Sequence, residues 1–72
     1  MKMQKVKSSN IKAVGYDEIT QKMRVEFFSG GLYEYDKVPR NTFLAFMKAE
    51  SLGKYFHKNI RGKFDTKPVP KS

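Results

Sequence analysis

Apolar and polar residues alternate through residues 22–28, and this period-two pattern restricts the middle of the chain to a half-buried β-strand. The apolar positions are Met23, Val25 and Phe27, and the polar positions are Lys22, Arg24 and Glu26. A Gly30-Gly31 pair follows, and residues 32–36 then resume a strand-like pattern. Two such segments joined through paired glycines predict a β-hairpin.

The length of the hairpin loop decides which residues face each other. A three-residue loop of residues 29–31 places Tyr33 and Tyr35 on the face of Phe27 and Val25. It sets Phe27 opposite Tyr33 and Val25 opposite Tyr35, with a glycine in the left-handed conformation. In this register Glu26 also lies opposite Glu34, which is mildly unfavourable. We expect the three-residue loop, because a two-residue loop would send both tyrosines to the other face.

The rest of the chain predicts one further strand and two helices. Residues 11–16 are β-branched and aromatic enough for a strand, and residues 3–7 are a candidate edge strand. A helix is expected over residues 40–50 after Pro39, and a second over residues 52–61 between a Ser51 N-cap and Gly62. Gly53 suggests close packing or a bend between the helices. The fold class is therefore α+β: a three-stranded, or with residues 3–7 four-stranded, antiparallel sheet covered on one face by two short helices.

Length and cysteine content narrow the class of protein. A chain of 72 residues holds one domain, and the absence of Cys excludes a disulfide or a Cys-ligated metal. We expect a basic N-terminal segment at 1–7, a folded domain at 8–64 and a flexible Lys/Pro tail at 65–72. Because no apolar run is long enough for a membrane span and no signal peptide is evident, we expect a cytoplasmic protein without a membrane partner.

Positive charge is concentrated at the two ends of the chain. The net charge of +8 divides into +4 over residues 1–12, −3 over 13–36 and +7 over 37–72. Such a distribution is typical of an anion-binding face, and nucleic acid is the most common large anion in a cell. The alternative is that excess lysine merely keeps the protein soluble.

The second predicted helix carries the best candidate binding residues. Lys54, Lys58 and Arg61 are spaced to project from one helical face, with His57 beside them, and tail residues such as Lys71 could extend the row. Such a basic helix edge would contact phosphates of RNA or another nucleic acid, although a solvated helix face has the same pattern. The predicted nucleic-acid-binding residues are Lys54, Lys58, Arg61, Lys63, Lys5 and Lys7.

Aromatic residues leave two further alternatives open. Tyr33 and Tyr35 lie on one sheet face, where they either belong to the core or form a surface that stacks bases. On the other face, Phe28 and Leu32 could form an exposed apolar patch. Such a patch would suit a protein-interaction adaptor that binds an apolar or acidic partner.

The sequence offers little for catalysis. His57 is the single histidine, and neither a nucleophile–base set nor a metal-ligand set can be assembled around it. We therefore expect no catalytic residue, no metal and no cofactor. A small ribonuclease built from His57, Arg61 and a tyrosine is the third functional alternative, after the nucleic-acid-binding module and the adaptor.

Several short motifs occur in an order that resembles the KTSC domain. They are Ser8-Ser9-Asn10-Ile11, Val14-Gly15-Tyr16-Asp17, the Gly30-Gly31 hairpin, Tyr33-x-Tyr35, Val38-Pro39, Tyr55-Phe56 and Ile60-Arg61-Gly62. That family is named for a module at the C-terminus of some lysyl-tRNA synthetases and also occurs as small stand-alone proteins. The resemblance covers residues 8–64 and implies RNA binding, with no catalytic residues to carry over. The motif residues, whose role would be mainly structural, are Tyr33, Tyr35, Gly30, Gly31 and Gly62.

Overall fold

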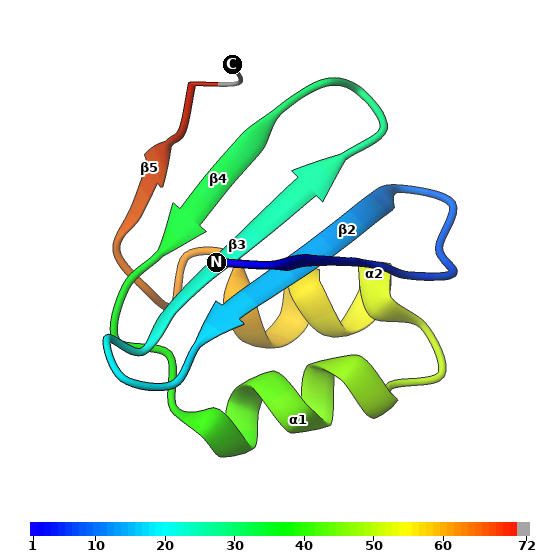
Figure 1. The fold of residues 1–72 in the computed structure, drawn as a ribbon. Helices are drawn as coiled ribbons and strands as arrows, with labels where there is room; N and C mark the ends of the chain where they lie inside the picture. Colours follow the sequence, from blue (N-terminus) through cyan, green and yellow to red (C-terminus); the bar gives the residue numbers. More distant parts are fainter. Residues whose placement is uncertain (71–72) are drawn as a thin grey trace.

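A computed structural model describes residues 1–70 and has an α+β architecture. Five antiparallel strands form one sheet in the order β1-β2-β3-β4-β5, so each strand pairs with its neighbour in sequence. Figure 1 shows the helices together on one face of this sheet. The elements are β1 (Met3–Lys5), β2 (Ile11–Asp17), β3 (Lys22–Phe27), β4 (Leu32–Tyr35), α1 (Arg40–Lys48), α2 (Leu52–Tyr55), the π-helical turn η1 (Phe56–Ile60) and β5 (Thr66–Pro68).

The predicted α+β class is confirmed, but the predicted number of strands is too low. The candidate edge strand near the N-terminus is present as β1. The flexible tail predicted from residue 65 is wrong for Thr66–Pro68, which pair with β4 as β5. Proline disfavours a strand because it lacks an N–H, yet an edge strand tolerates it because one of its sides needs no hydrogen bonds. The N–H of Val69 continues the pairing by donating to the Leu32 carbonyl at 2.8 Å. Lys71 lies outside the described residues.

The hairpin register differs from the prediction by two residues. Val25 lies opposite Tyr33 and Met23 opposite Tyr35. The loop comprises residues 28–30, because the N–H of Phe27 donates to the Gly31 carbonyl at 2.9 Å. Gly30, at the third loop position, has a φ of +108°, and a three-residue hairpin loop needs a left-handed residue there. A shift of two residues keeps both tyrosines on the predicted face while changing every partner.

The core lies between the sheet and the helices. The ring of Phe46 from α1 is fully buried, and Phe43 and Met47 from the same helix pack against the same cluster. Tyr16 stacks on Phe43 with centroids 4.5 Å apart, and its hydroxyl donates to the Val38 carbonyl at 2.6 Å. These contacts fix α1 over β2. The core residues are Ile11, Val14, Met23, Val25, Tyr35, Val38, Phe46, Leu52, Phe56 and Ile60.

The second predicted helix begins and ends as expected, but its last turn is wider. The Oγ of Ser51 accepts a hydrogen bond from the N–H of Lys54 at 3.3 Å, as an N-cap does. In η1 the N–H of Arg61 donates to the Phe56 carbonyl at 2.8 Å, a five-residue step. Gly62 follows with a φ of +75°. The wider turn means that the α-helical spacing assumed for the basic edge does not hold beyond Phe56.

Candidate functional site

Two surface hollows meet at the side chain of His57. The aromatic hollow has a volume of about 440 Å³ and is lined by Phe27, Tyr33, Tyr35, Phe56, His57, Arg61, Gly62 and Thr66. The lysine hollow has a volume of about 430 Å³ and is lined by Lys7, Ser8, Ser9, Asn10, Glu50, Ser51, Leu52, Gly53, Lys54 and His57. His57 therefore separates an aromatic cavity from a basic one.

The floor of the aromatic hollow is a set of rings packed edge to face. Phe56 contacts Phe27 and Tyr35 with centroid distances of 5.3 and 5.6 Å, and Phe27 contacts Tyr33 at 6.0 Å. Tyr35 is only 4% exposed, whereas Tyr33 is 37% exposed. Each of the two predicted alternatives, a core residue or a surface ring, therefore applies to one of the two tyrosines. Tyr35 is a core residue, and Tyr33 presents its ring at the surface.

Gly31 makes room for the ring of Tyr33. A Cβ at position 31 would lie 2.7 Å from Cε2 of Tyr33, a separation that real Cβ atoms essentially never show. The ring therefore lies against the backbone of the hairpin. Gly31 serves this close approach, whereas Gly30 and Gly62 serve backbone turns with positive φ.

Polar groups at the rim of the aromatic hollow are a guanidinium, an imidazole and a phenol. Nη1 of Arg61 lies 3.4 Å from Nδ1 of His57, a long contact in which the guanidinium is the donor. Burial, and to a smaller extent Tyr33, raise the pKa of Tyr35 to about 12, although Arg61 opposes this effect. Tyr35 is therefore a neutral phenol at physiological pH. The hollow thus offers aromatic surface beside one permanent positive charge.

The lysine hollow brings together basic residues from opposite ends of the chain. Lys7 follows β1 and Lys54 lies in α2, yet both line the same hollow. Sequence spacing gave no indication of this contact, because it depends on how the loop after β1 packs beside the N-cap of α2. Lys5 lies with Lys7 along a neighbouring depression. Lys58 and Lys63 are exposed but do not line either of the two hollows that meet at His57.

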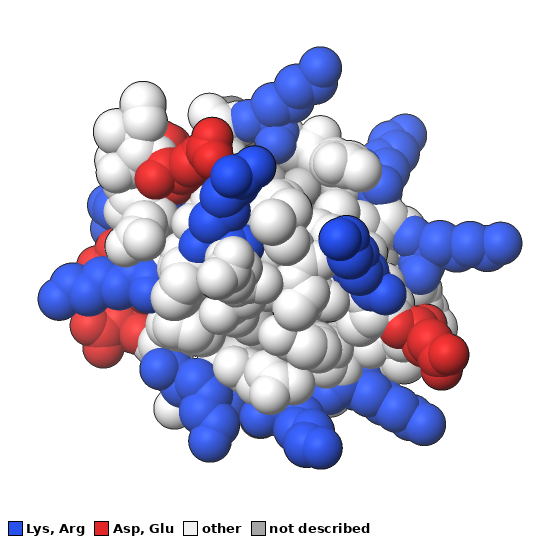
Figure 2. All heavy atoms as spheres, turned by 90° about the horizontal axis from the view of Figure 1, so that it is seen from below, with Lys and Arg blue, Asp and Glu red and all other residues white. Residues whose placement is uncertain are grey.

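Positive charge is spread more widely than a single helix edge. Figure 2 shows the molecule from the side on which α1 lies in Figure 1. Lysine and arginine side chains project from the rim of this face and also from within it, acidic residues interrupt them, and the surface between them is neutral. Positive charge is therefore not confined to one helix edge.

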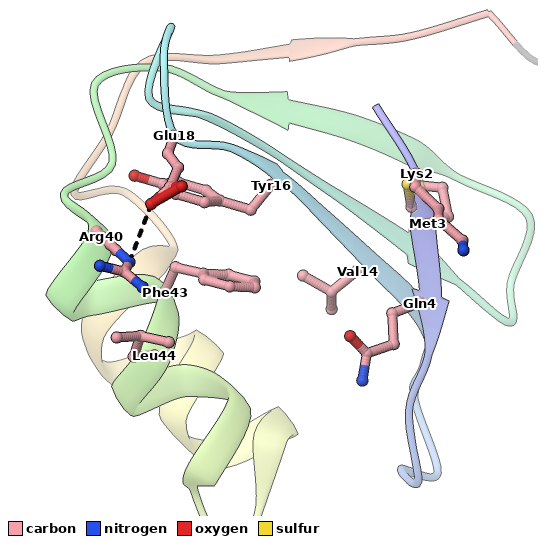
Figure 3. A pocket seen from close by; sticks show the side chains of 9 residues that line it. All are labelled: Lys2, Met3, Gln4, Val14, Tyr16, Glu18, Arg40, Phe43 and Leu44. Carbon is pink, nitrogen blue, oxygen red and sulfur yellow. Dashed lines mark ion pairs between the residues drawn. The ribbon is translucent and has the colours of Figure 1, made fainter.

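A third hollow, with a volume of about 550 Å³, lies between β1 and α1 (Figure 3). Val14 and the stacked rings of Tyr16 and Phe43 line its inner surface. At its rim Nε of Arg40 pairs with Oε1 of Glu18 at 3.1 Å. Lys2 also lines this hollow, whereas Arg40 is engaged by the Glu18 carboxylate.

Residues 1–70 contain neither a candidate metal site nor a candidate membrane-spanning helix. No group of three or more His, Cys, Asp and Glu side chains in this range could hold a metal ion. In the same range, no helix has the length and apolar character needed to cross a membrane.

Comparisons with known proteins give a consistent assignment. A family model described as the KTSC domain matches residues 7–64. A lysine–tRNA ligase of a Nostoc species is 47% identical over 60 residues, which are 83% of this chain and 11% of the ligase. An uncharacterized protein of Stutzerimonas stutzeri is 42% identical over 57 residues, covering 79% of this chain and 80% of that protein. The crystal structure of a KTSC domain protein from Yersinia pestis superposes with a TM-score of 0.94 at 35% identity, covering 96% of this chain and 97% of that one.

Proposed function

The chain belongs to the KTSC domain family, and from this premise we propose that it is a non-catalytic module that binds RNA or another nucleic acid. One observation carries the proposal: Lys7, Lys54 and Arg61 flank His57 at the junction of the aromatic and lysine hollows. A phosphate backbone that crosses this junction would contact cations on both sides of His57. Such contacts supply most of the affinity in nucleic-acid binding that reads little sequence.

The similarity to lysine–tRNA ligases favours RNA as the ligand. This chain spans only 11% of the length of the Nostoc ligase, so the activity of that enzyme is not assigned to it. Such ligases act on tRNA. A small module related to part of them is suited to bind RNA in the compartment where they act. We therefore propose a cytoplasmic RNA-binding role that does not include tRNA charging.

We propose a non-catalytic module because the chemistry at the junction is incomplete. The aromatic hollow has no Asp or Glu among its lining residues, and Glu50, which lines the lysine hollow, makes no hydrogen bond or ion pair with His57 that would orient it as a general base. Tyr35 holds its proton, because burial raises its pKa to about 12. His57, Arg61 and Tyr33 nevertheless share the hollow, so the ribonuclease alternative deserves a direct assay.

A protein-interaction adaptor is the second candidate function. The hollow between β1 and α1 offers apolar surface, and Phe28 is 60% exposed in the hairpin loop. The predicted patch of Phe28 opposite Leu32 is wrong in detail, because Leu32 pairs with Glu26. A protein partner that binds the hollow between β1 and α1 or the exposed Phe28 should form a complex that tolerates salt, unlike a complex with a polyanion.

A charge-removal experiment tests nucleic-acid binding. Changing Lys7, Lys54 and Arg61 to Gln removes up to three phosphate contacts, and each contributes roughly 0.7 to the salt slope on a single strand. The plot of log affinity against log salt should become shallower by up to about 2 units. A matched control changes Lys12, Lys37 and Lys48 to Gln, since these residues line neither of the two hollows that meet at His57.

The outcomes separate the two candidate functions. The first variant should bind a labelled RNA oligonucleotide more weakly than the control at low salt, as measured by fluorescence anisotropy. Equal binding by the two variants would contradict the proposed site. A wild-type protein that binds no RNA at low salt would contradict the proposed function and favour the adaptor.

A further inference from the structure

We infer that the aromatic hollow receives the base of an unpaired nucleotide, so that the module prefers single-stranded to double-stranded nucleic acid. This inference rests on the proposed function and names the class of ligand. It follows from the exposure, support and charge of the residues around Tyr33.

The ring of Tyr33 is both exposed and held in place. It is 37% exposed, lies against the backbone at Gly31 and contacts Phe27 edge to face at 6.0 Å. A supported aromatic ring loses little side-chain entropy when a planar ligand stacks on it. The volume of the hollow, about 440 Å³, lies within the range of roughly 300–1,000 Å³ that is common for small-molecule sites.

Arg61 supplies the second feature that a nucleotide requires. Its guanidinium is always charged and can donate to a phosphate or to a base oxygen. It lies at the rim of the same hollow, 3.4 Å from the imidazole of His57. Beyond His57, Lys7 and Lys54 line the adjacent hollow, where the next phosphate along the strand would lie. The arrangement therefore places one aromatic platform and one cation in the same hollow, with two further cations beyond His57.

The strand preference follows from the position of the platform. Bases in a duplex are stacked and paired, so they cannot reach a ring such as Tyr33 without leaving the helix. A duplex can still contact Arg61, Lys7 and Lys54 through its phosphates. Single strands should therefore use both the ring and the cations, whereas duplexes should use the cations alone.

The experiment compares a labelled 12-nucleotide poly(U) RNA with a 12-base-pair RNA duplex by fluorescence anisotropy. Base–aromatic stacking contributes about 1–3 kcal/mol per base, so Tyr33→Leu should weaken binding to poly(U) by about 5- to 150-fold. Its affinity for the duplex should change by less than about 2-fold. Tyr33→Phe retains the ring and should bind poly(U) like the wild type.

Two controls keep the result interpretable. Phe28→Leu removes an exposed ring from the neighbouring loop, outside the aromatic hollow, and should leave affinity for poly(U) unchanged. Thermal unfolding should show that Tyr33→Leu is folded at the assay temperature. If it is not, Tyr33→Thr, which keeps a β-branched residue suited to a strand but has no ring, replaces it and should show the same loss of affinity for poly(U).

Failure of the inference is distinguishable from failure of the proposed function. Suppose that the charge variant binds both RNAs more weakly than the wild type. If Tyr33→Leu then weakens binding to poly(U) and to the duplex equally, or weakens binding to neither RNA, the inference is wrong and the proposed function stands. Binding of uridine monophosphate as tight as that of poly(U) would also overturn the inference, because it would indicate a mononucleotide site. If the wild type binds neither RNA at low salt, the proposed function fails first.

Discussion

Arg24 lies directly opposite Glu34 in the β3–β4 ladder, and its Nε donates a hydrogen bond to Oε1 of Glu34 at 3.0 Å. Lys22 and Lys67 place their ammonium groups 3.6 and 3.3 Å from the other carboxylate oxygen. The Glu34 side chain is only 5% exposed. Burial alone would raise the pKa of Glu34, but Arg24, Lys67 and Lys22 together outweigh burial and lower it. This carboxylate therefore joins three neighbouring strands on the face of the sheet opposite the helices.

Glu34 should make the stability of the domain depend on acid. Because its pKa is lower in the folded state than its ordinary value of 4.5, its contribution is complete at neutral pH. That contribution is lost as the pH falls through 4.5 and below. Glu34→Gln should cost about 1–3 kcal/mol at pH 7, typical of charged hydrogen bonds, and much less at pH 3. Urea unfolding at the two pH values measures the difference.

The matched control for Glu34 is Glu18. Glu18 pairs with Arg40, but the two side chains are 62% and 66% exposed. Glu18→Gln should therefore change the free energy of unfolding by less than about 0.5 kcal/mol. Equal effects of the two substitutions would contradict the role assigned to Glu34.

The pair of Arg24 and Glu34 shows how much of the hairpin could be predicted from the sequence. Alternation predicted the strands and the face that each tyrosine shares with Val25. The expected register left Glu26 opposite Glu34, whereas the observed one sets Arg24 opposite Glu34. Cross-strand charge could have selected the correct register, because opposite charges stabilise a facing pair. The error came from the position of the loop, which comprises residues 28–30 instead of the expected 29–31.

Features that depend on tertiary packing could not be predicted from the sequence. Three residues of β5 carry too little pattern to predict a strand, and Pro68 argues against one locally. Lys7 and Lys54 line the same hollow because the loop after β1 packs beside the N-cap of α2. Helical spacing predicted that Lys54 and Arg61 share one face, but they line different hollows, since the π-helical turn η1 (Phe56–Ile60) lies between them.

Tyr33 and Tyr35 should differ in their effect on stability. Tyr35 is 4% exposed and packs on Phe56, so Tyr35→Ala should destabilise the domain by about 3–5 kcal/mol. Tyr33→Ala should cost only about 1–2 kcal/mol, because its ring buries less area. Thermal and urea unfolding of both variants check this difference. Equal losses would show that Tyr33 is also a core residue.

Two glycines should respond in opposite ways to alanine. Gly30 has a φ of +108°, so Gly30→Ala should cost about 1–2 kcal/mol although nothing crowds the added methyl group. In α2 a Cβ at Gly53 would meet only Nδ2 of Asn10 at 3.5 Å, an ordinary contact, so the close packing expected there is absent. Gly53→Ala should therefore stabilise the domain by about 0.5–1 kcal/mol. Urea unfolding measures both changes.

His57 should be dispensable for any chemistry on RNA. We expect the wild type and His57→Ala to leave a labelled RNA equally intact during a long incubation analysed by gel. The reason is that the aromatic hollow has no carboxylate among its lining residues, and Glu50, in the lysine hollow, makes no hydrogen bond or ion pair with the imidazole. Cleavage by the wild type that disappears in the variant would establish the ribonuclease alternative instead.

The strand β5 should protect the edge of β4. It covers that edge by pairing Thr66 with Tyr35 and Pro68 with Tyr33, and the N–H of Asp36 donates to the Asp65 carbonyl at 2.9 Å. Deleting residues 65–72 should cost about 2–3 kcal/mol, at roughly 1 kcal/mol for each backbone hydrogen bond lost. It should also expose a β4 edge that can pair with another chain. Thermal unfolding and sedimentation velocity at several concentrations measure both effects.

Two full-length variants separate the backbone pairing of β5 from its charge. Lys67→Gln keeps the strand but removes its ion pair with Glu34, so it should lower stability by less than about 1 kcal/mol and sediment like the wild type. Val69→Pro removes the N–H that donates to the Leu32 carbonyl at 2.8 Å and should cost about 1 kcal/mol. If the truncated chain unfolds at the wild-type temperature and sediments like the wild type, β5 neither stabilises the sheet nor protects its edge. If Lys67→Gln loses as much stability as the truncation, the ion pair with Glu34, rather than the backbone ladder, holds β5 in place.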